Sequence, residues 1–204
     1  MHVFRNDTPK RRLNRKECKH YTSYKKTLKE DFNSRCGYCD DIDFQKVRNF
    51  TIDHFIPQNP IGFTHTIAPN YYYNLVYSCG YCNMSKTNKW PTNNPKISND
   101  GNIGFIDPVE IDYTNLYQRD LNGKIQPTNS TNSLAKYIIK ELKLWLPIHQ
   151  KMWKLEQIRL LNNEIIIKLE NLKDGQLKDD LEKEHYKILK LWVSIQESIF
   201  VENA

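Results

Sequence analysis

The chain has 204 residues, of which 39% are hydrophobic and 26% are charged, and its formal net charge is +6. This composition is typical of a folded, soluble protein with one domain or a small domain plus an extension. No apolar run approaches the roughly 20 residues of a membrane span, and the first residues lack the apolar core of a signal peptide. We therefore expect a cytoplasmic protein with no membrane partner.

The positive charge is concentrated in the N-terminal segment. Residues 1–29 contain ten Lys and Arg against two acidic residues, whereas residues 51–130 contain five against six. A basic segment of this kind suits a phosphate backbone. We expect nucleic acid to contact Lys10, Arg11, Arg12, Arg15 and Lys16. The alternative is a basic face that contacts only solvent.

The first predicted element is a helix over residues 21–32, where Tyr24, Leu28 and Phe32 lie four residues apart on one face. Residues 36–128 are rich in Gly, Pro, Asn and Tyr. Within them, 49–55 and 73–78 are predicted strands, 100–101 is a predicted turn, and Asn122-Gly123 predicts a hairpin.

Residues 131–204 change to a helical periodicity. We expect helices over 133–145, 148–172 and 176–200, the first of them ending at Pro147. The apolar stripe of the third helix steps by four and three residues. These helices could form an intramolecular bundle, or could offer a seam to a partner or to a second copy of the chain. His185 lies on this stripe, which favours a packed histidine over a metal ligand.

Four of the five cysteines form two matched pairs, Cys36-Gly-Tyr-Cys39 and Cys79-Gly-Tyr-Cys82. Two C-x-x-C pairs can complete a tetrahedral zinc site, and a reducing compartment favours metal over disulfides. We therefore predict a structural zinc ion with no open position for water. Two unrelated pairs of buried thiols are the alternative, and Cys18 lies apart from both pairs.

The residues between and after the cysteine pairs have a different chemistry. Asp53, His54, Asn74, Asn83 and Lys86 bring a carboxylate, an imidazole, two amides and an ammonium, which suit a hard cation and a phosphate. Asp53 and His54 are adjacent on a predicted strand, so their side chains would point to opposite faces unless the chain bends there. The sequence thus predicts one metal for shape and a second for catalysis.

This pattern resembles the HNH endonucleases. The resemblance rests on Asp53-His54-x-x-Pro57, Asn74-Leu75 and Cys79-x-x-Cys82-Asn83-x-x-Lys86, and it covers about residues 35–90. It implies an α+β fold in which a ββα-metal core, held by a four-cysteine zinc site, precedes a C-terminal helical bundle. The expected divisions are a basic segment (1–35), the nuclease core (36–128) and a helical region (129–204).

The resemblance also implies roles for the matched residues. His54 would be the general base that takes a proton from water, and Asp53 and Asn83 would ligate the catalytic ion. Asn74 would orient His54 or brace its loop, and Lys86 would lie near the phosphate. Asn83 stands where the founding motif has His, and its hard oxygen favours Mg²⁺ or Mn²⁺.

A looser similarity extends over the rest of the chain. Lys89-Trp90-Pro91, Gly104–Pro108 and the helical tail resemble small stand-alone HNH proteins of bacterial anti-phage systems, such as the nuclease subunit of Septu-type systems. That resemblance implies a defence effector that cuts DNA and works with an ATPase partner.

Two questions stay open at the level of sequence. A non-catalytic zinc module that binds nucleic acid or a partner protein is the alternative to an enzyme, and RNA is an alternative substrate to DNA. Tyr71–Tyr73 could stack on bases or could cover a small core.

Overall fold

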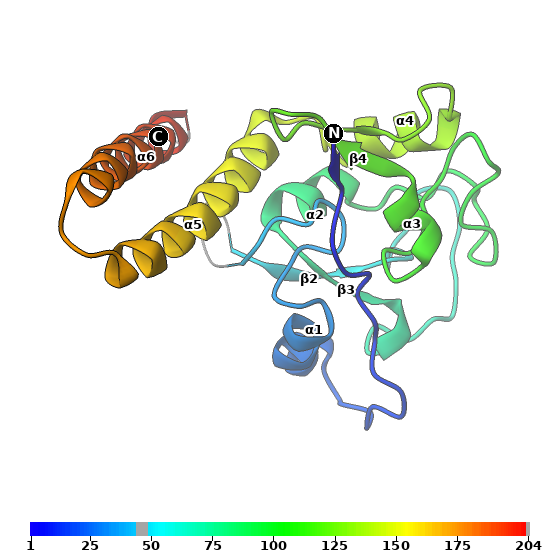
Figure 1. Cartoon of the computed structure of the whole chain (residues 1–204). Helices are drawn as coiled ribbons and strands as arrows, with labels where there is room; N and C mark the ends of the chain where they lie inside the picture. The colour runs from blue at the N-terminus through cyan, green and yellow to red at the C-terminus, as the bar shows by residue number, and fades with distance from the viewer. Residues whose placement is uncertain (44–48, 203–204) are drawn as a thin grey trace. The chain divides into compact units, whose positions relative to one another are not determined.

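The computed structural model describes residues 1–43 and 49–202 (Figure 1). It is an α+β fold, as predicted, and it divides into two compact units, Met1–His149 and Gln150–Ala204. The strands and the short helices all lie in the first unit. The functional regions expected at 1–35, 36–128 and 129–204 remain a prediction.

A two-stranded antiparallel sheet and one helix form the centre of the first unit. Strand β2 (Thr51–His54) pairs with β3 (Leu75–Ser78), and Thr51 lies opposite Ser78. Helix α2 (Gly80–Lys86) begins directly after β3. Both predicted strands are confirmed, although each is shorter than expected. The residues before β3 form a short 3-10 helix, η2 (Tyr72–Asn74).

A second sheet joins the N-terminus to the hairpin that the sequence predicted. Its order is β1 (His2–Val3), β4 (Tyr117–Arg119), β5 (Ile125–Pro127), and all its pairings are antiparallel. The hairpin turn contains Gly123 at φ 86°, a conformation that glycine adopts without strain. Helix α3 (Ile111–Asn115) leads into β4.

The N-terminal helical segment packs its predicted face into the core. It consists of η1 (Tyr21–Tyr24) followed by α1 (Lys25–Asp31). Tyr24, Leu28 and Phe32 are fully buried, so the spacing of four residues identified the core face correctly.

Helix α4 (Ser133–Glu141) is shorter than predicted. Lys143 has φ 53°, and the Leu144 amide donates to the Ile139 carbonyl oxygen, a backbone pattern that terminates helices. Pro147 therefore does not stop this helix. It opens the next one, α5 (Pro147–Asn171), because a first-turn proline has no intrahelical bond to lose.

The second unit consists of α5 from Gln150 onward and α6 (Gln176–Glu202). The predicted stripe of α6 is its less exposed side, and Ile199 on that stripe is buried. His185 on the same stripe contacts Asn162 of α5 through its Nε2, 2.6 Å from Oδ1. The C-terminal helices are thus confirmed as a pair, whereas α4 belongs to the first unit. No helix within 1–43 and 49–202 is long and apolar enough to cross a membrane.

Candidate active site

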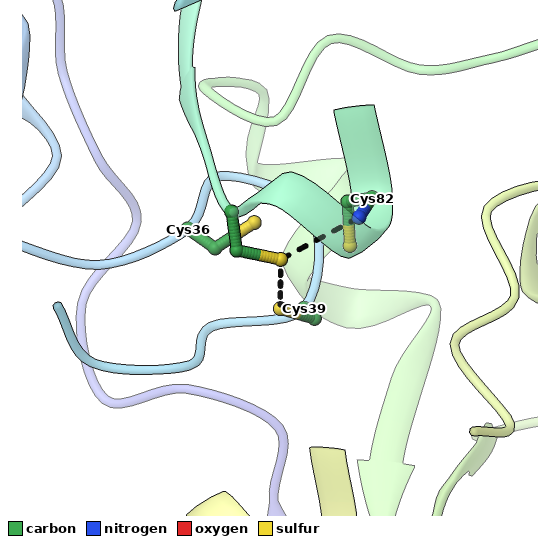
Figure 2. A group of neighbouring side chains, drawn as sticks. Cys36, Cys39 and Cys82 are labelled. Atoms are coloured by element: carbon green, nitrogen blue, oxygen red, sulfur yellow. Dashed lines mark hydrogen bonds between the residues drawn. The ribbon is translucent and has the colours of Figure 1, made fainter. Parts of the chain in front are cut away.

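The four paired cysteines converge in the first unit. Their sulfur atoms all lie within 4.8 Å of one another, and all four side chains are buried. Figure 2 shows Cys36, Cys39 and Cys82 pointing toward a common centre. None of the chain's cysteines, all of which lie in the described residues, forms a disulfide. The fifth, Cys18, lies outside the cluster, as expected.

Backbone hydrogen bonds shape both knuckles. In the first, the Cys36 amide donates to the Asp41 carbonyl oxygen and the Asp40 amide donates to the Cys36 carbonyl oxygen. In the second, Cys79 is the N-cap of α2, and its sulfur accepts from the Cys82 amide at 3.5 Å. Local hydrogen bonds therefore shape the turn of each cysteine pair.

The cluster fits a zinc ion. A tetrahedral zinc with Zn–S bonds of about 2.3 Å has S–S edges of about 3.8 Å, and the Cys39 and Cys79 sulfurs lie 3.7 Å apart. Burial raises the pKa of the Cys39 and Cys82 thiols, so these two stay protonated without a cation. A bound zinc would reverse this preference, since it binds thiolates.

A polar cavity of about 360 Å³ lies at the end of β2 and along α2. Three of the predicted site residues line it, namely Asp53, His54 and Asn83. Strand β2 ends at His54, and the chain bends from Phe55 onward. Asp53 and His54 thus both line the cavity although they are adjacent in β2. The other lining residues are Ile52, Pro57, Gln58, Asn59, Thr87 and Asn88.

The Asp53 carboxylate is buried and has two strong donors. The Tyr38 hydroxyl donates to its Oδ2 at 2.5 Å, and the Lys86 ammonium lies 3.1 Å from the same oxygen. Burial raises the pKa of Tyr38 well above its usual value, and the Asp53 charge adds to this effect, so the hydroxyl remains a donor.

The His54 ring is oriented by a backbone carbonyl. Its Nε2 lies 2.7 Å from the Pro69 oxygen, and the amide nitrogen of Gln58 lies 2.9 Å from Nε2 and 3.3 Å from Nδ1. A carbonyl can only accept, so the hydrogen belongs on Nε2 and Nδ1 keeps a lone pair. Burial lowers the pKa of His54, and the Lys86 charge acts in the same direction. The imidazole is therefore neutral at neutral pH.

The two amides are placed differently. The Asn83 Nδ2 donates to Thr51 Oγ1 at 2.8 Å, so β2 engages the nitrogen of this amide, and its oxygen is the acceptor. Asn74 does not line the cavity. Its side chain accepts from the Ile56 amide and donates to the Ile56 carbonyl oxygen, so it fixes the bend that follows His54.

The placement of Lys86 differs from the predicted one. Its side chain is fully buried, and its ammonium contacts Asp53 and donates to the His54 carbonyl oxygen at 2.8 Å. It does not line the cavity, although its partner Asp53 does, so its position near a phosphate stays a prediction.

Only some of the basic residues in the N-terminal segment are exposed and could contact nucleic acid. Arg11 is 5% exposed, bonds Asp107 at 2.7 Å and donates to the Leu75 carbonyl oxygen, so it is an interior group. Arg12 pairs with Glu30 and Asp31, and Arg15 lies over the Tyr24 ring. Within the described residues, the predicted contacts that remain exposed and without an ion pair are Lys10 and Lys16.

Several residues at these sites had no signal in the sequence. Tyr38 lies inside a cysteine knuckle, Thr51 opens β2, and Gln58 follows the Asp-His motif by four positions. Beside the cysteines, Asp41 and His149 form a buried pair with Oδ2 and Nδ1 2.5 Å apart. Except for Gln58, each acts through a contact between segments that are well separated in sequence, which no local pattern records.

Two comparisons with known proteins agree with this geometry. Residues 36–89 match the family model described as "HNH endonuclease". The "Septu protein PtuB" of Bacillus mycoides (strain KBAB4) is 27% identical over 202 residues, covering 87% of this chain and 67% of that protein. A search of the solved structures found no match.

The matched region contains both cysteine pairs, Asp53, His54 and Asn83. Residues 36–89 thus resemble HNH endonucleases, as the motifs predicted. Over most of its length the chain also resembles a Septu protein.

Proposed function

We propose that this chain is a metal-dependent HNH endonuclease that hydrolyses phosphodiester bonds of DNA. The observation that supports this most is the cavity lined by Asp53, His54 and Asn83 beside a cluster of four cysteines. A carboxylate, an amide oxygen and a neutral imidazole in one polar cavity are the groups that metal-assisted hydrolysis needs.

Asp53 and Asn83 would hold the catalytic ion. Their oxygen donors favour Mg²⁺ or Mn²⁺ over zinc, and Mg²⁺ keeps several positions for water and phosphate oxygens. The Thr51 contact supports this role of Asn83, because it engages the amide nitrogen and leaves the oxygen as the atom that can bind the ion. When bound, the ion would supply positive charge to the phosphate and the leaving oxygen.

His54 would act as the general base through Nδ1. The Pro69 carbonyl holds the hydrogen on Nε2, so Nδ1 is the nitrogen that can take a proton from the attacking water. The lowered pKa of His54 supports the same role, because the base must be neutral before it acts. Asn74 would be a positioning residue, since its two bonds to Ile56 fix the turn behind the imidazole.

Plasmid cleavage tests this function. Zinc-loaded protein with Mg²⁺ or Mn²⁺ is expected to nick or cut plasmid DNA, and His54→Ala should reduce the rate by about 10²-fold or more. His2→Ala is the matched control, because His2 is exposed on β1 and lies outside the cavity. Equal rates for His54→Ala and the wild type would refute the assignment of the base, and absence of any cleavage would favour the non-catalytic zinc module.

The same assay decides between the nucleic acids. The described cavity residues do not decide between the sugars, because amides such as Gln58 and Asn59 can bond a phosphate oxygen or a 2′-hydroxyl, so RNA remains the second candidate substrate. Faster cleavage of an RNA of the same sequence would reassign the substrate.

We also propose a role in anti-phage defence with an ATPase partner, which the similarity to a Septu protein supports. The exposed apolar side chains of α5 and α6, such as Leu161, Ile167 and Val193, are consistent with a partner or a second copy there. Cells that carry the chain with its partner should resist phage, and His54→Ala should abolish that resistance.

A further inference from the structure

The proposed ion site has an unusual charge balance. Among the cavity-lining residues of the described chain, Asp53 is the one with a formal charge. Both of its donors, the Tyr38 hydroxyl and the Lys86 ammonium, contact Oδ2. An ion at Asp53 and Asn83 would therefore meet a carboxylate whose charge an internal cation already offsets.

Lys86 is held firmly in this arrangement. Its side chain is fully buried beside the Phe105 ring, and the His54 carbonyl oxygen accepts a second hydrogen bond from the ammonium. Charges in such surroundings interact more strongly than charges in water, because little solvent screens them. The ammonium therefore attracts Asp53 and repels any cation that approaches the same carboxylate.

We propose that Lys86 makes binding of the catalytic ion depend on nucleic acid. In the free protein the pair of Lys86 and Asp53 offers no net negative charge, so a divalent cation binds weakly. A phosphodiester in the cavity supplies the missing negative charge, so the ion and the nucleic acid bind cooperatively. This inference rests on the proposed function, since it concerns the same ion site.

A purely structural role for Lys86 predicts the opposite result. If the ammonium only held Asp53 in place, its removal would loosen the carboxylate and weaken ion binding. If it competes with the ion, its removal should strengthen ion binding in the free protein. The sign of the change in affinity therefore distinguishes the two roles.

Binding of Mn²⁺ to the zinc-loaded full chain provides the test, with free Mn²⁺ measured by electron paramagnetic resonance. Lys86→Met should lower the Mn²⁺ dissociation constant of the free protein by about tenfold or more, because it removes a charge close to the ion. Lys86→Gln, which keeps a donor for Asp53 without the charge, should shift it in the same direction. The Lys86→Gln variant also provides the test if the Lys86→Met variant does not fold.

Tyr38→Phe is the matched control, since it removes a donor to the same oxygen but no charge. Its Mn²⁺ affinity should stay within about threefold of the wild type, because the ion pair is intact. Unchanged or weaker Mn²⁺ binding in both Lys86 variants would overturn the inference.

A short DNA duplex completes the experiment, in the His54→Ala background so that it is not cut. The duplex should tighten Mn²⁺ binding by about tenfold or more, and by reciprocity Mn²⁺ should tighten duplex binding by the same factor. This coupling should shrink in the Lys86 variants, and coupling of wild-type size there would overturn the inference. Mn²⁺ binding that is insensitive to Asp53→Asn, with duplex present, would instead refute the proposed ion site.

Discussion

Gly37 lies where a side chain would collide with the core. A Cβ built on it would come 2.7 Å from Val76 Cγ1 and 2.8 Å from the Phe32 ring. Gly37 does not have a positive φ. Glycine is therefore needed at this position because it has no side chain, and not because of its backbone freedom. The structure thus gives Gly37 a packing role between β3 and the end of α1.

Gly37→Ala should therefore destabilise the chain by about 1–3 kcal/mol, the usual range for overpacking a dense core. Thermal and denaturant unfolding of the zinc-loaded protein would measure the change. Gly101→Ala is a useful comparison, because its Cβ would meet nothing within 4 Å while φ +89° still costs about 1 kcal/mol. Unchanged stability of Gly37→Ala would contradict the packing role.

The residues of the candidate site differ in how far sequence could place them. The spacing of the cysteines and the Asp-His motif are local patterns, so both could be predicted from the sequence. The burial of Lys86 could not be predicted from the sequence, because its partner Asp53 lies 33 positions earlier and on another element. Arg11 was misjudged for the same reason, since Asp107 is far along the chain.

At the scale of elements, periodicity identified the helices better than their ends. The α1 face and the α6 stripe follow from spacing alone. The end of α4 does not follow from spacing, because the left-handed conformation of Lys143 ends the helix without a glycine or a proline. Pro147 was read as a stop signal, although proline favours the first turn of a helix just as well.

The elements β2, β3 and α2 are short, so the metal should contribute much of their stability. Four-residue strands and a seven-residue helix bury little surface by themselves. Chelation of zinc should therefore unfold them, because free energy of metal binding becomes free energy of folding. Hydrogen exchange should show loss of amide protection at 51–54 and 75–86 once zinc is removed.

The control for this prediction uses the fifth cysteine. Cys39→Ser should lower the zinc content measured by mass spectrometry, whereas Cys18→Ser should leave one zinc per chain, because Cys18 lies outside the cluster. Intact protection of β2, β3 and α2 in the zinc-free chain would show that packing alone maintains them.

At the scale of the whole molecule, contacts through Asn70 and Tyr21 connect the basic N-terminal segment to the candidate base. Asn70 donates to the Glu17 carboxylate and to the Cys18 carbonyl oxygen, both at 2.9 Å. Its neighbour Pro69 accepts from His54, and the Tyr21 ring lies 4.8 Å from the His54 ring. The segment 16–21 is thereby tied to the candidate base.

That segment exposes Lys16 and Lys19, and the following turn of helix exposes Lys25 and Lys26. Tyr71 and Tyr73 next to Asn70 are exposed as well, whereas Tyr72 is buried and bonds Asp31. The two alternatives for these tyrosines therefore apply to different residues. Tyr72 covers the core, and the exposed rings of Tyr71 and Tyr73 could stack on bases. The sequence shows where the basic residues are concentrated, but it could not predict which of them form internal ion pairs in the folded chain.

The double variant Lys16→Gln/Lys19→Gln should weaken binding of duplex DNA and flatten its salt dependence by about 0.9 in log–log slope for each phosphate that the variant no longer binds. The matched control is Lys136→Gln/Lys140→Gln, which removes the same charge from exposed positions of α4. If both pairs weaken binding equally, the effect is one of net charge alone. If only the first pair acts, a phosphate backbone passes along 16–21 toward His54, and cleavage by that variant should be restored at low salt, because its catalytic groups are intact.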